Sequence, residues 1–91
     1  MRLDLFLKKT CVLAQRTAAR EACDAGAVHV NGLPAKASHA LRAGDRVALH
    51  LARRELEICV LEIPAGNVAK RDAGRYVQVL RDELRPANDF L

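Results

Sequence analysis

The chain has 91 residues, a length that suits one domain and is too short for two. Hydrophobic residues make up 51% of it, but sixteen of them are alanine and only three are aromatic, so the core must be small and aliphatic. No apolar run approaches the roughly 18 residues of a membrane-spanning helix, and the chain opens on a charged amphipathic pattern that does not resemble a signal peptide.

Charge is divided unevenly along the chain, whose formal net charge is +4. Residues 1–54 hold ten basic and four acidic residues, a net of +6, whereas residues 55–91 hold five basic and seven acidic residues, a net of −2. A basic front half predicts a polyanionic partner such as nucleic acid. The plainer alternative is a solvated surface rich in arginine.

Three cysteines are present, and no two of them have the CxxC spacing of a zinc or redox motif: Cys11, Cys23 and Cys59. An odd number argues against a disulfide framework. Reduced, partly buried thiols in a cytoplasmic protein are therefore the best interpretation.

Residues 3–11 are predicted to form the first helix. Asp4 lies in its first turn, where a carboxylate is favoured by the helix dipole and can cap the helix, and Lys8 lies at the far end, where a cation is favoured. The apolar residues recur at helical spacing and are expected to share one buried face: Leu3, Phe6, Leu7 and Cys11.

The second predicted helix runs from Thr17, its expected N-cap, to about Ala25. Gly26 stands where a C′ glycine ends a helix. The buried face should consist of small residues, which allow close packing: Ala19, Ala22 and Cys23.

After Gly26 the hydrophobic period changes to two, which predicts strands. Asn31-Gly32 and Gly44-Asp45 indicate turns, and Pro34 restricts the segment around it to an edge strand. Arg53-Arg54 is expected to form a basic turn. The expected strands are residues 27–30, a short edge strand within 33–43, residues 46–51, and residues 55–61 with Leu56, Ile58 and Val60 on one face.

Beyond Pro64 the pattern is weaker. Residues 67–75 are interpreted as a short helix or a loop, and residues 76–80 as an edge strand, with a helix running to Leu84 as the alternative. Residues 86–91 are expected to fray. The chain is thus predicted to be an α+β domain of two N-terminal helices packed on a small antiparallel sheet, with a domain over 1–63 and a short C-terminal extension over 64–91.

Catalysis is not indicated. Ser38 is the only serine, and no Ser/His/Asp set can be assembled around it. His29 and His50 fall on the polar side of predicted strands, where they should be exposed, and with His39 they lack metal-ligand spacing. No Gly-rich phosphate loop is present either. We therefore expect a protein without enzymatic activity, metal, cofactor or small-molecule substrate.

The basic residues are better organised. Arg16 and Arg20 stand one turn apart at the start of the second helix, whose N-terminus favours phosphate through its N–H groups and dipole. Because few aromatic residues are available to stack on single-stranded bases, structured RNA, recognised through phosphate and shape, is the better ligand. Further basic residues lie off the first helix's apolar face or beside the turns: Arg2, Lys8, Lys9, Lys36, Arg42 and Arg46.

Five short motifs occur in order: Arg2-Leu3-Asp4-Leu5-Phe6-Leu7, Arg16-Thr17-Ala18-Ala19, Gly26-Ala27-Val28-His29-Val30-Asn31-Gly32, Lys36-Ala37-Ser38 and Gly44-Asp45. In this order and spacing, over roughly residues 1–52, the chain resembles the RNA-binding domain named after ribosomal small-subunit protein four, the S-four domain. The short acidic tail is more similar to the stand-alone RqcP-like ribosome quality-control factors than to the related fifteen-kilodalton heat-shock protein.

The resemblance implies binding to ribosomal RNA, and to tRNA or peptidyl-tRNA, on the large ribosomal subunit during rescue or quality control of stalled translation. It implies a cytoplasmic factor, expected to be a monomer. Asp4 should orient Arg2 or Arg16. The expected RNA surface consists of residues carried over by motif, together with Lys8 from the first helix: Arg2, Asp4, Lys8, Arg16, Thr17, Arg20, Lys36 and Ser38.

Three alternatives remain open from the residues. The chain could recruit a separate RNA-modifying enzyme to its substrate. It could be a small DNA-binding module in which the two helices mimic a helix-turn-helix, although the following strands fit this poorly. It could also be a protein-interaction domain with an incidental basic face.

Overall fold

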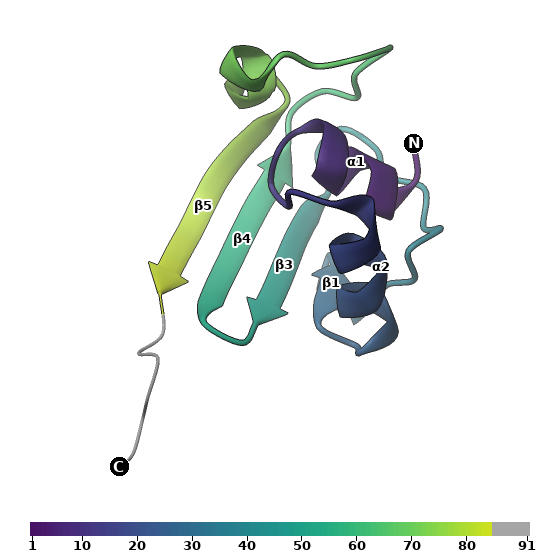
Figure 1. Ribbon diagram of the computed structural model, residues 1–91, viewed down its shortest axis with the longest axis vertical. Helices are drawn as coiled ribbons and strands as arrows, with labels where there is room; N and C mark the ends of the chain where they lie inside the picture. The colour runs from purple at the N-terminus through teal and green to yellow at the C-terminus, as the bar shows by residue number, and fades with distance from the viewer. Residues whose placement is uncertain (85–91) are drawn as a thin grey trace.

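Two α-helices, one 3₁₀-helix and a five-stranded antiparallel sheet form the fold of the computed structural model, which describes residues 1–84 (Figure 1). The order of strands in the sheet is β2-β1-β3-β4-β5. Helices α1 and α2 lie on one face of the sheet, over β1 and β3 (Figure 1). Strand β5 forms the edge of the sheet farthest from the helices. The predicted α+β class, with two N-terminal helices on a small antiparallel sheet, is confirmed. The prediction for residues 86–91 lies outside the described range.

Helix α1 spans Leu3–Lys9, so it ends earlier than predicted. The hydroxyl of Thr10 donates to the Phe6 carbonyl at 2.8 Å, and Cys11 takes a left-handed backbone conformation with φ of 62°. This turn carries Cys11 off the helical spiral, and its side chain is exposed. Its predicted place in the core is therefore wrong, whereas the other predicted core residues are buried: Leu3, Phe6 and Leu7.

Helix α2 spans Arg16–Asp24, and its N-cap lies two residues before the predicted one. Gln15 is the N-cap, in an extended conformation, and its side chain makes no capping hydrogen bond. The prediction that Thr17 caps the helix is thus wrong. Thr17 lies inside the first turn because the backbone already enters the helix at Arg16.

The end of α2 follows the prediction. Gly26 has φ of 75°, its N–H donates to the Cys23 carbonyl, and the next N–H, of Ala27, donates to the Ala22 carbonyl. Ala19 and Cys23 are buried and Ala22 is half-buried, as expected. Burial raises the pKa of the Cys23 thiol, and all three cysteines are free.

The first turn and strands also match the predicted pattern. Asn31 and Gly32, with φ of 52° and 86°, form the turn between β1 and β2. Pro34 lies in the two-residue edge strand. The first four strands span Val28–Val30 (β1), Leu33–Pro34 (β2), Arg46–Leu51 (β3) and Arg54–Val60 (β4).

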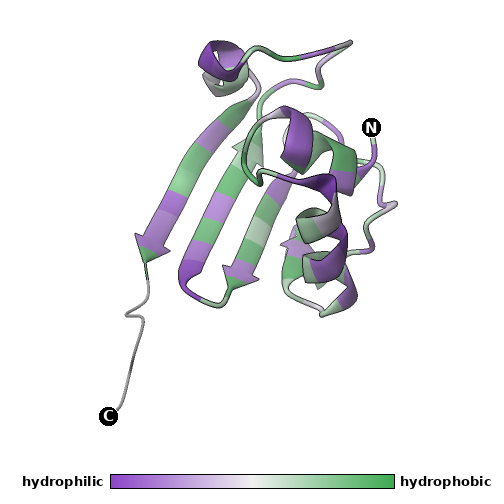
Figure 2. Cartoon of the chain, viewed as in Figure 1, coloured by the Kyte–Doolittle hydropathy of each residue, from purple (hydrophilic) through white to green (hydrophobic). Residues whose placement is uncertain are grey.

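Strand β4 begins earlier than predicted, because Arg54 pairs with Leu51 across the β3–β4 hairpin. Its turn is therefore formed by residues 52–53, and Arg53-Arg54 is not the turn. Figure 2 shows the alternation of hydrophobic and hydrophilic residues along the strands. The inward-facing residues of β4 are buried as predicted: Leu56, Ile58 and Val60.

After a 3₁₀-helix, η1 (Lys70–Arg75), strand β5 spans Val77–Leu84. The predicted edge strand is confirmed, and it is longer than expected because β5 pairs along the whole of β4. A β-bulge shifts the register after Glu57. Residues 77–84 are thus part of the same sheet, and the domain boundary at residue 63 stays a prediction.

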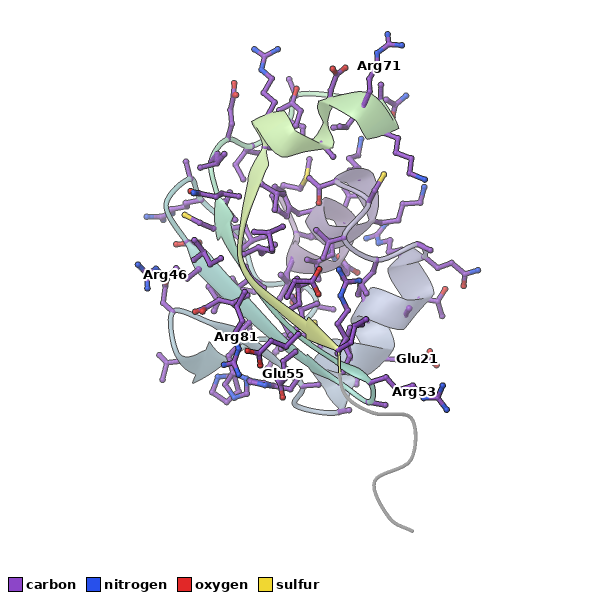
Figure 3. All side chains as sticks on the ribbon, turned by 90° about the vertical axis from the view of Figure 1, so that its left-hand side faces the viewer. Glu21, Arg46, Arg53, Glu55, Arg71 and Arg81 are labelled. Carbon is purple, nitrogen blue, oxygen red and sulfur yellow. The ribbon has the colours of Figure 1, made fainter. Side chains whose placement is uncertain are left out.

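The face of the sheet opposite the helices is polar: Figure 3 shows Arg46, Glu55 and Arg81 on that side. His50 Nδ1 lies 2.6 Å from a Glu55 carboxylate oxygen. His29 is half-buried and not exposed as predicted, because its ring packs edge-on against that of His50 at 5.2 Å. Within residues 1–84, no helix is long and apolar enough to cross a membrane, and no three metal-ligating side chains cluster.

Candidate nucleic-acid interface

A buried carboxylate lies at the centre of the candidate site. Asp4 is 0% exposed and its two oxygens bind two arginines. Arg2 donates from Nε at 3.1 Å and from Nη2 at 3.3 Å, and Arg16 donates from Nε at 3.2 Å. The Leu5 N–H also donates to Asp4, at 2.8 Å. We call Arg2, Asp4 and Arg16 the Asp4 cluster.

The Asp4 carboxyl is held in its ionised form. Burial acts to raise its pKa, but hydrogen bonds from Arg16, from Arg2 and from the Leu5 N–H outweigh burial, so the pKa lies below its ordinary value. The two arginine side chains remain 48% and 45% exposed. Each guanidinium therefore keeps further N–H donors with which it can bind a phosphate.

The chain after β2 positions the start of α1. The N–H of Leu3 donates to the His39 carbonyl at 2.8 Å. The N–H of Asp4 donates to the Ala37 carbonyl at 3.1 Å. These N–H groups belong to the first turn of a helix, which has no partners of its own for them. Residues 37–39 thus fix the helix start that carries Asp4.

The other predicted RNA-surface residues are exposed but are not all joined to this cluster. Thr17 and Arg20 lie on α2, the helix that Arg16 begins. Within residues 1–84, no hydrogen bond or ion pair links Lys8 or Arg20 to Asp4. That these residues contact RNA stays a prediction. The predicted RNA-surface residues outside the Asp4 cluster are all exposed: Lys8, Thr17, Arg20, Lys36 and Ser38.

Sequence reasoning foresaw that Asp4 orients Arg2 or Arg16; in the structure it orients both. It missed the contribution of Ala37 and His39, which act through backbone carbonyls. A carbonyl acceptor has no side-chain signature, so the sequence did not indicate this backbone role, although Ala37 lies within the motif Lys36-Ala37-Ser38.

A second arginine–carboxylate pair joins β4 and β5 at the end of the sheet that carries the β3–β4 hairpin. Arg54 donates to Asp82 through Nε and Nη2, both at 2.8 Å, and the two side chains are 39% and 41% exposed. The hydrogen bond from Arg54 lowers the pKa of Asp82. This pair joins neighbouring strands and leaves no surplus of positive charge.

Comparison with known proteins assigns the N-terminal part of the chain to a family. The family model described as "S4 domain" matches residues 1–47, which include both helices and the segment that positions α1. The chain belongs to the S4 domain family. The resemblance to the S-four domain is therefore confirmed, and the Asp4 cluster lies within the S4 domain match.

Relatives of this S4 domain chain share most of its length. It is 40% identical over 78 residues to the Helicobacter pylori protein named RQC P-site tRNA stabilizing factor, covering 85% of this chain and 93% of that one. It is 32% identical to the Bacillus subtilis protein of the same name, covering 91% and 95%. The trimeric structure of Vibrio cholerae heat shock protein 15 superposes with a TM-score of 0.78 at 26% identity, covering 87% of this chain and 80% of that one.

Proposed function

We propose that this S4 domain protein binds ribosomal RNA and P-site tRNA on the large ribosomal subunit, as a non-enzymatic factor in the quality control of stalled translation. The single observation that carries the proposal is the Asp4 cluster: a buried carboxylate that holds two exposed arginines side by side. The names of the relatives supply the ribosomal setting, because they describe stabilisation of P-site tRNA.

The chemistry of the cluster suits phosphate. An arginine whose Nε is bound by a carboxylate has a fixed orientation, so less side-chain entropy is lost when its outer N–H groups bind an anion. Arg16 is also the first residue of α2, where the helix dipole favours negative charge. Lys36 precedes the segment that pairs with α1, Ser38 lies within it, and both side chains are exposed.

Arg16→Ala is the direct test. It should lower affinity for large ribosomal subunits about tenfold, the equivalent of one charge-assisted contact of about 1.5 kcal/mol. Co-sedimentation with whole ribosomes, free subunits and stalled large subunits measures this, with Arg53→Ala as the control in the β3–β4 turn. Unchanged binding by a folded Arg16→Ala would place the interface elsewhere.

Salt dependence gives a second measurement. About five phosphate contacts predict a log–log slope of affinity against salt of about −3.5 to −4.5, and Arg16→Ala should reduce its magnitude by about 0.7–0.9. A slope near zero for the unsubstituted protein contradicts phosphate binding and favours a protein-interaction domain. Stronger binding to duplex DNA than to ribosomal RNA favours the DNA-binding alternative.

The proposed factor acts in the cytoplasm and as a monomer. Light scattering after size-exclusion chromatography tests the monomer against the trimer described for the Vibrio cholerae protein.

A further inference from the structure

A hollow of about 420 Å³ opens between the β1–β2 turn and the chain that follows β2. Its volume falls within the range of sites that hold a small ligand, and it is large enough for one base and its sugar. Leu33, on the two-residue edge strand, is 70% exposed although it is large and apolar. Six of the residues that line the hollow carry the argument below: Asn31, Leu33, Pro34, His39, Arg42 and Asp45.

Three hydrogen bonds connect the residues of the polar wall of the hollow. Asn31 Nδ2 donates to one Asp45 carboxylate oxygen at 3.1 Å, and the Arg42 N–H donates to the other at 2.9 Å. The Asn31 side-chain oxygen accepts the Arg46 N–H at 3.0 Å. The wall is therefore organised before any ligand arrives, which lowers the entropic cost of binding.

The hollow adjoins the Asp4 cluster. Arg2 pairs with Ala40 in an antiparallel bridge, and the His39 carbonyl accepts the Leu3 N–H. The backbone of His39 and Ala40 thus forms the boundary between the hollow and the start of α1. A nucleotide next to a phosphate bound by Arg2 would lie near the hollow.

The side chains around the opening suit a base. His39 and Arg42 are planar groups of the kinds that stack on unpaired bases in RNA-binding proteins. Leu33 and Pro34 add an apolar surface. Arg42 adds positive charge that complements the phosphate backbone of the RNA whose base would enter the hollow. We propose that the hollow receives one unpaired base of the RNA, an inference that rests on the RNA-binding function proposed above.

The first experiment uses single nucleotides as probes. The full chain labelled with ¹⁵N is titrated with each of the four 5′-nucleoside monophosphates and, separately, with ribose 5-phosphate. At least one nucleotide should shift the amide resonances of Leu33, His39 and Arg42, whereas ribose 5-phosphate should leave them unchanged. Identical shifts with ribose 5-phosphate, or no shift around the hollow with any nucleotide, would overturn the proposal.

The second experiment separates stacking from charge. His39→Ala should weaken binding to ribosomal RNA at least about fivefold, the lower end of what removal of a stacking side chain costs. The salt slope should stay unchanged, because a stacking contact with a base does not replace a counterion of the phosphates. His50→Ala, which changes a histidine that does not line the hollow, is the matched control, and circular dichroism checks the fold of both.

The outcomes distinguish the two proposals. RNA binding with the full salt slope, unaffected by His39→Ala, overturns the base-binding hollow and leaves the proposed function intact. No salt-dependent RNA binding by the unsubstituted protein overturns both.

Discussion

The Asp4 cluster and the Arg54–Asp82 pair use the same chemistry in different surroundings. The hydrogen bonds of Arg54 to Asp82 are the shorter, at 2.8 Å against 3.1–3.3 Å in the Asp4 cluster. Asp4, however, is 0% exposed, whereas the Asp82 side chain is 41% exposed. Water competes for the exposed pair and screens it, so its shorter distances do not imply greater stability.

Burial of the acceptor, and not bond length, therefore distinguishes the Asp4 cluster from a surface ion pair. A buried carboxylate that lost its arginines would be left without compensation, so the fold itself holds Arg2 and Arg16 in place. Asp82 can be solvated by water instead, so the fold does not depend on its pairing with Arg54.

Replacing each carboxylate by alanine tests this comparison most strongly. Asp4→Ala should lower the free energy of unfolding by about 1–3 kcal/mol, because the Leu5 N–H loses its acceptor and both arginines lose their partner. The melting temperature should fall by roughly 4–8 °C for each kcal/mol. Asp82→Ala is the matched control and should melt close to the unsubstituted protein. Equal losses of unfolding free energy in the two variants would show that burial of the carboxylate does not determine its contribution to stability.

Asp4→Asn tests whether the charge of Asp4 contributes to RNA binding. Asparagine preserves the shape of the side chain and can accept a hydrogen bond, but it loses the charge that orients the guanidinium groups. The variant should fold, as judged by circular dichroism, and bind RNA about tenfold more weakly, although simple charge counting predicts tighter binding. Equal or tighter binding in a titration at fixed salt would reduce Asp4 to a structural residue.

Titration of Asp4 gives the smallest expected effect. Its folded pKa lies below the unfolded value of about 3.9, so the unfolded chain binds more protons between the two values and stability rises with pH there. The stabilisation is fully present above the unfolded pKa and is lost as the pH falls through the folded pKa. In urea denaturation, the stability difference between the unsubstituted protein and Asp4→Asn should therefore shrink below about pH 4. A difference that is constant with pH would contradict this assignment.

Periodicity predicted the elements of this fold better than their ends. The alternation of β4 and the C′ position of Gly26 are local properties, so the sequence shows them. The prediction for Cys11 is wrong because its left-handed backbone conformation interrupts the helical spacing. The prediction for Thr17 is wrong because the helix begins after Gln15, whose side chain makes no capping hydrogen bond.

The sequence likewise indicated one part of the candidate site and not the other. The pairing of Asp4 with arginine could be anticipated from charge and spacing. The contribution of residues 37–40 could not, because it depends on long-range backbone pairing. The hollow beside it was missed for the same reason: Leu33 and Arg42 come together only when the chain after β2 folds back.

The pairing of the first residues with residues 37–41 also has a practical consequence. Besides the Arg2–Ala40 bridge, the Leu41 N–H donates to the Met1 carbonyl at 2.9 Å, so the chain is anchored from its first residue. An affinity tag or fluorescent fusion placed ahead of Met1 would emerge beside the Asp4 cluster and obstruct it. Labels for binding assays are better attached after β5, at the far edge of the sheet from α1 (Figure 1).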